Sequence, residues 1–295
     1  MREHLLLFME HCDYPKDAIS AILEAYDVAM ADKESADVIS AIIAAYDADV
    51  NCDYEGNIAL CENLSEKHSI SKHTYELLVF MVLTKRLKER YDERGLEEEI
   101  YWESMLDLKW KVLECYGVKG VYGTFVAKWF IGWFRLTRFA LGRLQFELVK
   151  FGREYERDGV KLDPTTNVLN VHIPRSLRPL TPEAVDDSFG RAKVFYARFF
   201  TDKPCVFVCS SWMLYPGNKE FLHPLSNTAR FADRFDILSY SEDAKDSNPN
   251  VWRVFNAPYN GDPSTLPVTS SITAGLKEFL IKGGKMGSAY GVLLY

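Results

Sequence analysis

Apolar side chains in the first 120 residues recur at intervals of three and four positions. Ile19, Ile22, Leu23 and Tyr26 lie at i, i+3, i+4 and i+7, and residues 39–46 repeat the spacing. Such spacing predicts amphipathic helices. The two segments share the pattern D-x-I-S-A-I-x-x-A-Y-D over residues 17–27 and 37–47. A solenoid needs at least three such units, so two copies indicate a pair of packing helices.

Two longer helices are expected after this pair. One runs from Ser71 to about Arg94, before Gly95, and the other from Leu96 to about Tyr116, before Gly117. Glycine is a common helix C-cap because it adopts the left-handed conformation readily. Residues 1–120 are therefore predicted to form a helical N-terminal domain.

The periodicity changes after a short aromatic helix at residues 125–133. In residues 143–148, the polar Arg143, Gln145 and Glu147 alternate with apolar residues. A period of two predicts a strand with one polar face and one apolar face. This change predicts a second domain over residues 121–295.

Strands and helices alternate through the rest of the chain. The expected strands are residues 168–173, 205–213, 235–240, 251–255 and 288–294, and the expected helices are residues 182–199, 218–222 and 271–281. This order predicts an α/β or α+β sheet domain with helices packed on its faces. For the whole chain, a helical N-terminal domain followed by a mixed sheet domain, the expected fold class is α+β.

Composition and charge restrict the classes of partner that the protein is expected to bind. The net charge of −7 argues against nucleic acid, which binds clusters of lysine and arginine. The six cysteines form no CxxC pair or zinc-type cluster, so free thiols and no metal are expected. The apolar run near Met1 is too short for a signal peptide, and four basic residues interrupt residues 125–146. A cytoplasmic protein with no membrane partner is expected, and a homodimer is left open.

Two polar strand faces carry candidate chemistry. Asn170 and His172 share one face of the strand at residues 168–173, and Gln145 and Glu147 share one face of the earlier strand. A histidine at a strand end suits a general base, and a hydrogen-bonded structural histidine is the alternative. Glu147 either removes a proton or pairs with Arg143.

The loop between the strand ending at Ile173 and the helix opening at Thr181 is a candidate anion site. Thr181 is an expected N-cap with Pro182 after it, and Arg175 and Arg178 lie in the loop. The helix dipole and unpaired N–H groups favour a phosphate there. The alternative is a capped helix with two solvated arginines, since the loop has no glycine-rich cradle.

The apolar run from Cys205 indicates a buried strand whose end, at Ser211 and Trp212, reaches a cleft. Neither serine there lies in G-x-S-x-G, and Cys209 has no adjacent histidine, so a covalent nucleophile is disfavoured. Arg230 and Arg234 lie four positions apart and either contact an acidic ligand or pair with Asp233 and Asp236.

The second half of the chain resembles a family of predicted acyltransferases with a helical N-terminal domain and a GNAT-like C-terminal domain. The matching segments are Gly142-Arg-Leu-Gln-Phe-Glu147, Val171-His-Ile-Pro174, Pro179-Leu-Thr-Pro-Glu183, Cys209-Ser-Ser-Trp-Met-Leu214, Ser226-Asn-Thr-Ala-Arg-Phe-Ala-Asp-Arg-Phe235 and Tyr290-Gly-Val. The family commonly has histidine where this chain has Ser210, and the glycine loop that binds acetyl-CoA in GNAT enzymes is missing.

The resemblance implies acyl transfer from acyl-CoA or acetyl-CoA to a small-molecule or amine acceptor by direct attack. It places the pyrophosphate near Arg175, Arg178 and Thr181, and the acceptor near Gln145, Asn170, Ser211, Trp212, Asn227 and Arg230. Glu147 or His172 then takes the acceptor proton, and Tyr215 is a candidate for protonating the thiolate. The alternative is a non-catalytic GNAT-like module for ligand sensing or protein interaction, which the missing glycine loop favours.

Overall fold

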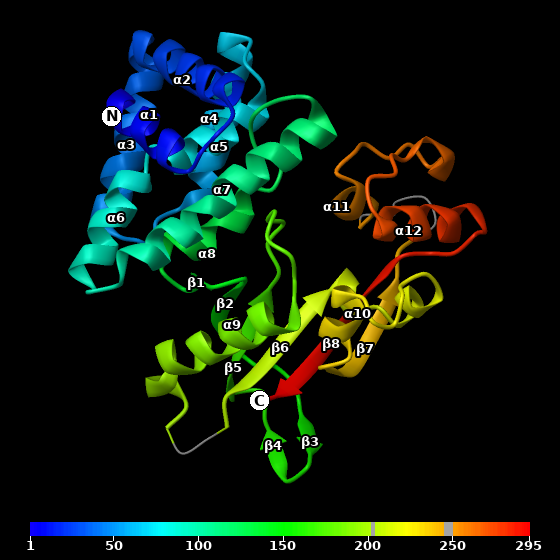
Figure 1. Ribbon diagram of the computed structural model, residues 1–295. Helices are drawn as coiled ribbons and strands as arrows, with labels where there is room; N and C mark the ends of the chain where they lie inside the picture. The colour runs from blue at the N-terminus through cyan, green and yellow to red at the C-terminus, as the bar shows by residue number, and fades with distance from the viewer. Residues whose placement is uncertain (202–203, 245–249) are drawn as a thin grey trace. The chain divides into compact units, whose positions relative to one another are not determined.

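The structure is a computed structural model that describes residues 1–201, 204–244 and 250–295. The chain forms two compact units, Met1–Phe139 and Ala140–Tyr295 (Figure 1). Residues 121–139, which the sequence pattern assigned to the second domain, group with the first unit. The aromatic residues of this segment explain the grouping: Phe130 and Phe134 are buried and pack on Phe80, with ring centroids 5.2 and 5.1 Å apart.

The first unit is helical throughout. Its elements are α1 (Arg2–His11), α2 (Lys16–Ala31), α3 (Lys33–Ala48), α4 (Tyr54–His68), α5 (Lys72–Met81), α6 (Thr84–Glu93), α7 (Glu98–Lys119), the 3-10 turn η1 (Ala127–Phe130) and α8 (Ile131–Phe134). Helix α5 is central, because every residue from Thr74 to Met81 is buried. A helix that is buried on all sides lies in the interior of a bundle.

The helix expected over residues 71–94 is divided into α5 and α6. Val82 donates its N–H to Leu78, but Leu83 donates to Phe80, three residues back. The turn therefore tightens at Leu83, and the chain passes from a fully buried helix to one with an exposed charged face. The expected end of the next helix at Gly117 is also wrong, since α7 continues to Lys119 and Gly120, with φ of +72°, is its C-cap.

The second unit is built on a mixed sheet. Within the described residues it has six strands in the order β1-β2-β5-β6-β8-β7, and a separate β3-β4 hairpin. The strands are β1 (Arg138–Leu141), β2 (Leu144–Lys150), β3 (Tyr155–Arg157), β4 (Val160–Leu162), β5 (Asn167–His172), β6 (Val206–Ser211), β7 (Asp236–Glu242) and β8 (Gly287–Leu294). The pair β5-β6 is parallel, whereas β2-β5, β6-β8 and β7-β8 are antiparallel.

Helices and 3-10 turns connect these strands. They are α9 (Pro182–Phe195), η2 (Ala197–Phe199), η3 (Trp212–Leu214), η4 (Pro216–Glu220), α10 (Asn227–Ala232), α11 (Val251–Phe255), η5 (Pro263–Thr265) and α12 (Ser271–Ile281). The α+β fold class expected from the sequence is thus confirmed. The strand expected at residues 251–255 is wrong, because α11 is a helix whose Val251 and Phe255, at i and i+4, both pack with α12.

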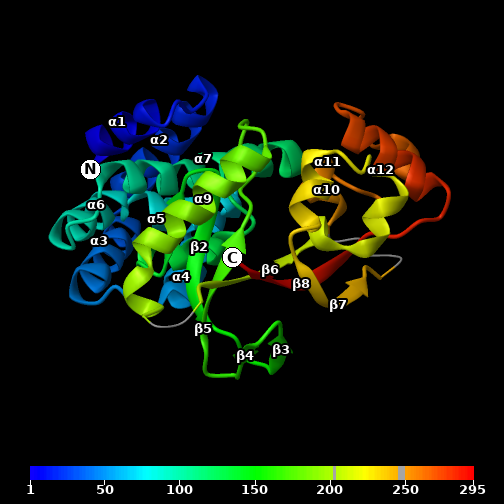
Figure 2. The ribbon, with the colours of Figure 1, turned by 60° about the horizontal axis from the view of Figure 1, so that its bottom comes forward.

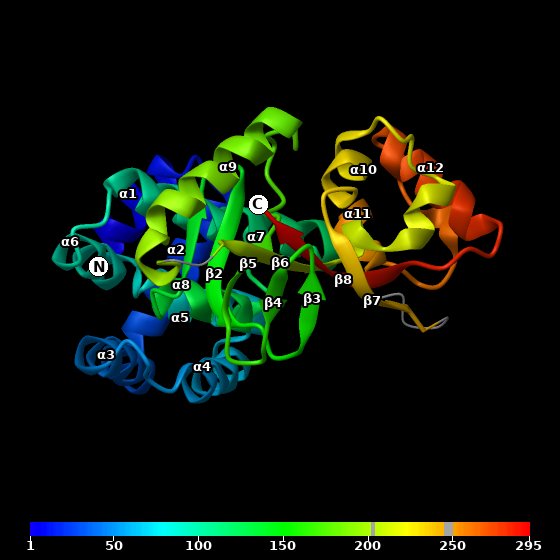
Figure 3. The same cartoon turned by 90° about the horizontal axis from the view of Figure 1, so that it is seen from below.

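The two faces of the sheet are covered differently. Phe146 and Phe207 pack against Phe189 of α9, with ring centroids 5.9 and 4.6 Å from it. The β3-β4 hairpin covers part of the other face, where its Leu162 joins Val168 and Val208 in an apolar cluster. Helix α9 and the hairpin lie on opposite sides of β5 and β6 (Figures 2 and 3).

Candidate active site

Four polar side chains form a patch on one face of β2 and β5. In the antiparallel register, Gln145 lies opposite His172, and Glu147 lies opposite Asn170. Residues directly opposite each other, and residues two apart on one strand, project to the same face. The structure therefore brings together Gln145, Glu147, Asn170 and His172, which the sequence pattern proposed on two separate strands.

His172 and Glu147 are in contact within this patch. The imidazole Nε2 of His172 lies 3.3 Å from Oε2 of Glu147 and 3.4 Å from Nδ2 of Asn170. The side chains of His172 and Glu147 are 14% and 19% exposed, so the pair is partly shielded from water but accessible. A carboxylate at this distance stabilises the protonated imidazole, so the pair can accept and hold a proton. The alternative pairing of Glu147 with Arg143 is replaced by the contact with His172.

The apolar face beneath the patch holds β2 and β5 rigidly. Phe146 and Val171, which lie between the polar residues in the sequence, are almost fully buried. Tyr196, at the C-terminal end of α9, donates its hydroxyl to the carbonyl of Phe146 at 3.0 Å. The alternation of polar and apolar residues in these strands therefore fixes the patch on a packed base.

Strands β5 and β6 are paired over only part of their length. The registered pairs are Leu169 with Phe207 and Asn170 with Val208, whereas β5 continues to His172 and β6 to Ser211. On its other side, β6 remains paired with β8 as far as Ser211. The registered pairs of β5 with β6 therefore end at Asn170, and the main chain of β5 continues past them to His172, beside the polar patch.

The loop from Pro174 to Thr181 joins β5 to α9, and two arginines fix its shape. Arg143 donates from Nε to the carbonyl of Arg178 at 2.9 Å and from Nη1 to that of Pro174 at 3.1 Å. Arg178 donates from Nη2 to the carbonyl of Gly142 at 3.1 Å. Burial, with a smaller contribution from the Arg178 charge, lowers the pKa of Arg143 to about 10. Arg143 lies in the β1-β2 turn, just before the strand in which the sequence pattern placed it.

The other predicted phosphate ligands also have contacts within the chain. Arg175 donates from Nη1 to the carbonyl of Arg253 at 3.1 Å. Thr181 is the N-cap of α9, as expected, and its hydroxyl accepts the N–H of Ala184 at 3.3 Å. The binding of phosphate by Arg175, Arg178 and Thr181 stays a prediction. In the structure, Arg178 binds the loop to the β1-β2 turn, and Arg175 binds it to α11.

Ser188 on α9 is a residue of this region that the sequence pattern did not single out. Its hydroxyl accepts the N–H of Arg143 at 2.7 Å and donates to the carbonyl of Ala184 at 2.8 Å. It thereby binds the β1-β2 turn to α9. A buried serine in mid-helix carries no local signal for such a contact, because its partner lies 45 residues away in the sequence.

Ser211 and Trp212 lie at the end of β6, where the chain turns into η3. The hydroxyl of Ser211 accepts the N–H of Met213 at 3.1 Å, so this serine caps the 3-10 turn. Trp212 packs on the apolar cluster of α11 and α12. Cys209, the last buried residue of β6, is fully enclosed, and this burial raises the pKa of its thiol to about 12.

Tyr215 follows η3 and contacts the far edge of the sheet. Its hydroxyl donates to Oε1 of Glu242, at the end of β7, at 3.3 Å. Burial and the Glu242 carboxylate raise the pKa of the phenol above its ordinary value, so it stays protonated at neutral pH. Tyr215 also lines a cavity of about 440 Å³, together with Leu222, Phe235 and Ile237.

Asn227 and Arg230 lie on α10, away from the polar patch. The turn that follows α10 is linked to α9 by the ion pair of Arg234 with Asp186, on the face of the sheet opposite to Glu147 and His172. Asn227 is the first residue of α10, and Arg230 is exposed. Of the two alternatives for Arg234, the pairing with Asp233 and Asp236 is wrong, since its carboxylate partner is Asp186 of α9.

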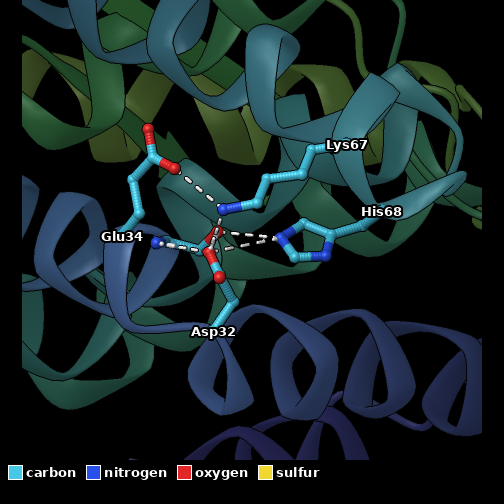
Figure 4. A network of polar contacts seen from close by, with 5 residues as sticks. Asp32, Glu34, Lys67 and His68 are labelled. Carbon is cyan, nitrogen blue, oxygen red and sulfur yellow. Dashed lines mark hydrogen bonds and ion pairs between the residues drawn. The ribbon is translucent and has the colours of Figure 1, made fainter.

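The first unit contains a serine, a histidine and an aspartate in contact. Ser35 donates its hydroxyl to Oδ2 of Asp32 at 2.7 Å, and its Oγ lies 2.8 Å from Nε2 of His68. Lys67 binds Asp32 and Glu34 beside them (Figure 4). In a hydrolytic triad the histidine lies between the other two residues, whereas here the serine bonds both, and His68 Nε2 lies farther, 3.9 Å, from Asp32 Oδ2. The network is therefore an N-cap of α3 that binds the end of α4.

Residues 1–201, 204–244 and 250–295 contain no group of three histidine, cysteine or acidic side chains arranged to hold a metal ion. The helices described there include none long and apolar enough to span a membrane.

Comparisons with known proteins identify the family. Residues 138–293 match the GNAT-like C-terminal domain, and residues 3–136 match the N-acyltransferase N-terminal domain. No curated protein matches the chain. One similar solved structure is an acyltransferase in complex with decanoyl-CoA and teicoplanin, with 24% sequence identity and a TM-score of 0.71. Another is an acyltransferase in complex with CoA and 10C-teicoplanin, with 23% sequence identity and a TM-score of 0.72.

Each of these alignments covers 97% of this chain and 86% of the other. At this identity, the likeness establishes that the fold is shared along almost the whole chain. The two family matches together account for both units of the structure and meet beside the boundary at Phe139. The chain therefore belongs to the family of acyltransferases that join an N-acyltransferase N-terminal domain to a GNAT-like C-terminal domain.

Proposed function

We propose that this protein is an acyl-CoA-dependent acyltransferase that transfers an acyl group to a nucleophilic acceptor, with the His172-Glu147 pair as proton acceptor. The family membership supports the reaction class, and the related structures contain decanoyl-CoA and CoA. The observation that carries the proposal is the contact of 3.3 Å between His172 Nε2 and Glu147 Oε2 on the polar face of β2 and β5.

The residues beside this pair fit an acyl-CoA. The main chain of β5 next to His172 extends beyond its registered pairs with β6, so an extended amide-containing arm can bind along it. The N-terminus of α9 follows the loop that starts two residues later, and a helix N-terminus favours phosphate. When bound, the thioester supplies an activated acyl group.

The chain then has two tasks. The acceptor, which we propose to be an amine, must lose a proton as it attacks, and His172 takes it while Glu147 stabilises the resulting imidazolium. Gln145 and Asn170, in the same patch, are proposed to orient the acceptor. The buried thiol of Cys209 offers no thiolate near neutral pH, which supports direct attack.

Tyr215 is proposed to protonate the departing thiolate. Its raised pKa keeps the phenol protonated at neutral pH, as a general acid requires. Ser211, Trp212, Asn227 and Arg230 stay proposed contacts of the substrate. The proposed contacts of the phosphates stay Arg175, Arg178 and Thr181. The two arginines would bind the phosphates from the loop whose shape their own main-chain contacts hold.

A non-catalytic GNAT-like module is the second candidate, and one observation favours it. The guanidinium groups of Arg143 and Arg178 donate to main-chain carbonyls of the loop and of Gly142, so a phosphate would compete with these contacts. This candidate predicts ligand binding or protein interaction without acyl transfer.

Hydrogen exchange tests the acyl-CoA site that the first candidate requires, and acyl transfer itself separates the two candidates. The amides of residues 171–185 and 209–214 are followed with octanoyl-CoA, free CoA and octanoate. Protection of both segments by octanoyl-CoA and CoA, and not by octanoate, is the result expected of an acyl-CoA site. Protection of neither segment by either coenzyme would refute the proposed site.

A further inference from the structure

The polar patch continues across the sheet onto β6 and β8. Asn170 is registered with Val208, so His172 and Ser210, two residues further along their parallel strands, project to the same face. Ser210 is registered with Tyr290 of β8. His172, Ser210 and Tyr290 therefore lie in one row on the face that carries Glu147.

The row lies at the border of the surface that the hairpin covers. Val206 and Val208 of β6 are 1% and 2% exposed beneath the hairpin, whereas Ser210, the next residue on that face, is exposed. An exposed serine in the middle of a six-stranded sheet means that this part of the face is accessible. The accessible surface is bounded by Tyr290 on β8.

A cation from the hairpin connection lies against Tyr290. The guanidinium carbon of Arg153 is 4.1 Å from the centroid of the Tyr290 ring, a stacking distance. Phe151, two residues earlier, packs near the same ring, with centroids 6.5 Å apart. A guanidinium held over an aromatic ring by its charge still has N–H groups to donate to a carboxylate.

The hairpin that follows Arg153 is fixed to the sheet. Tyr155 donates its hydroxyl to Oδ2 of Asp236 at 3.2 Å, and Nη1 of Arg157 lies 2.9 Å from Oδ1 of the same carboxylate. Leu162 is buried in the cluster under the hairpin. These contacts position Arg153 over Tyr290.

We propose that Arg153, Tyr290 and Ser210 form an acceptor subsite that binds a carboxylate of the acyl acceptor. The subsite deepens the proposed function and rests on it, because the row begins at His172. Guanidinium and carboxylate bind through charge-assisted hydrogen bonds, and Tyr290 and Ser210 border the same surface.

The row also sets a length for the acceptor. Neighbouring strands lie about 4.8 Å apart, so β8 is about 10 Å from β5, and more where β5 and β6 diverge. An extended chain spans about 3.3–3.6 Å per residue. The carboxylate is therefore about a tripeptide's length from the amine that receives the acyl group.

Triglycine and triglycinamide are the matched probes, since they differ only in the terminal carboxylate. Their dissociation constants are measured by NMR titration of the labelled protein in the presence of CoA. Wild type is expected to bind triglycine about tenfold more tightly than triglycinamide, a difference of about 1.4 kcal/mol in binding free energy. Arg153→Gln is expected to abolish the preference, and Arg153→Lys to restore part of it through the charge.

Lys161→Gln is the control, because Lys161 is an exposed cation on the same hairpin that pairs with Glu156 at 3.6 Å. It is expected to keep the wild-type preference. Equal binding of the two probes by wild type, binding of neither, or an unchanged preference in Arg153→Gln would overturn the subsite. Failure of acyl transfer is detected separately, by release of CoA from octanoyl-CoA, so it is distinguishable from failure of the subsite.

Discussion

The imidazole Nε2 of His172 lies 3.3 Å from Oε2 of Glu147, although 25 residues separate them in the sequence. The antiparallel register of β2 and β5 creates this contact, and the packing of Phe146 and Val171 beneath it holds the register. A one-residue slip of β2 against β5 would turn Glu147 to the face covered by α9, away from His172. The apolar packing on one face is thus the condition for the chemistry on the other.

Replacing Arg143 with alanine should destabilise the second unit. The change leaves the carbonyls of Arg178 and Pro174 without their guanidinium donor, at a cost of about 1–3 kcal/mol. Urea unfolding followed by fluorescence measures the change. Arg191→Ala is the matched control, because Arg191 is an exposed arginine paired with Asp187, and it should cost at most about 1 kcal/mol. Equal effects of the two variants would contradict the structural role of Arg143.

Cys209 should not react with iodoacetamide in the native protein. Its thiol is fully buried, and this burial raises its pKa to about 12, so the thiolate is scarce and inaccessible at neutral pH. Mass spectrometry of peptides from native and guanidinium-unfolded protein measures the modification, and the unfolded protein serves as the control. Rapid alkylation of native Cys209, with loss of activity, would instead point to a covalent nucleophile.

Replacing Glu76 with glutamine should stabilise the first unit in a pH-dependent way. Burial, together with a hydrogen bond to Glu62 and the Glu62 charge, raises the pKa of Glu76 to about 8. In the unfolded chain this carboxyl ionises near pH 4.5, so the unfolded state loses its proton first as the pH rises. Wild-type stability therefore falls between about pH 4.5 and about pH 8, and the glutamine variant lacks this loss.

Urea unfolding from about pH 5 to about pH 9 measures this difference. The advantage of Glu76→Gln over wild type should grow up to about pH 8 and then remain constant. Glu66→Gln, at an exposed position of α4, should show no such growth. An advantage that is the same at every pH would show that the carboxyl is not the cause.

Ser35→Ala should destabilise the first unit by about 1–3 kcal/mol. The fully buried hydroxyl of Ser35 binds both Asp32 and His68, so its removal leaves His68 without that partner. Ser40→Ala on the same helix is the control, since the Ser40 hydroxyl is exposed and bonds only the carbonyl of Ala36 among the contacts of the described residues. Thermal unfolding of both variants measures the effect, and equal midpoints would disprove the role of Ser35.

Elements with strong local signals were predictable from the sequence. Helix α12 spans the expected residues 271–281 because Ser270 and Thr273 form a capping box at its start. The polar faces of β2 and β5 followed from simple alternation. Alternation could not give the register, because the pairing of Glu147 with Asn170 depends on how two distant strands pack.

Other elements had weaker signals. The β3-β4 hairpin was missed because its strands have three residues each, although its turn, Asp158-Gly159, is a known hairpin signal with φ of +50° and +78°. The roles of Arg143 and Arg178 were also not predictable. An arginine in a loop looks the same in a sequence whether it binds a ligand phosphate or a carbonyl of its own chain.

The most direct test of the central claim is CoA release from saturating octanoyl-CoA with a panel of amine acceptors, comparing wild type with His172→Gln and Glu147→Gln. Lys150→Gln, at the exposed end of the same strand as Glu147, is the control. We expect His172→Gln to lower kcat by about 10²- to 10⁴-fold, with octanoyl-CoA binding unchanged in calorimetry. A His172→Gln variant that transfers the acyl group at the wild-type rate would contradict the account.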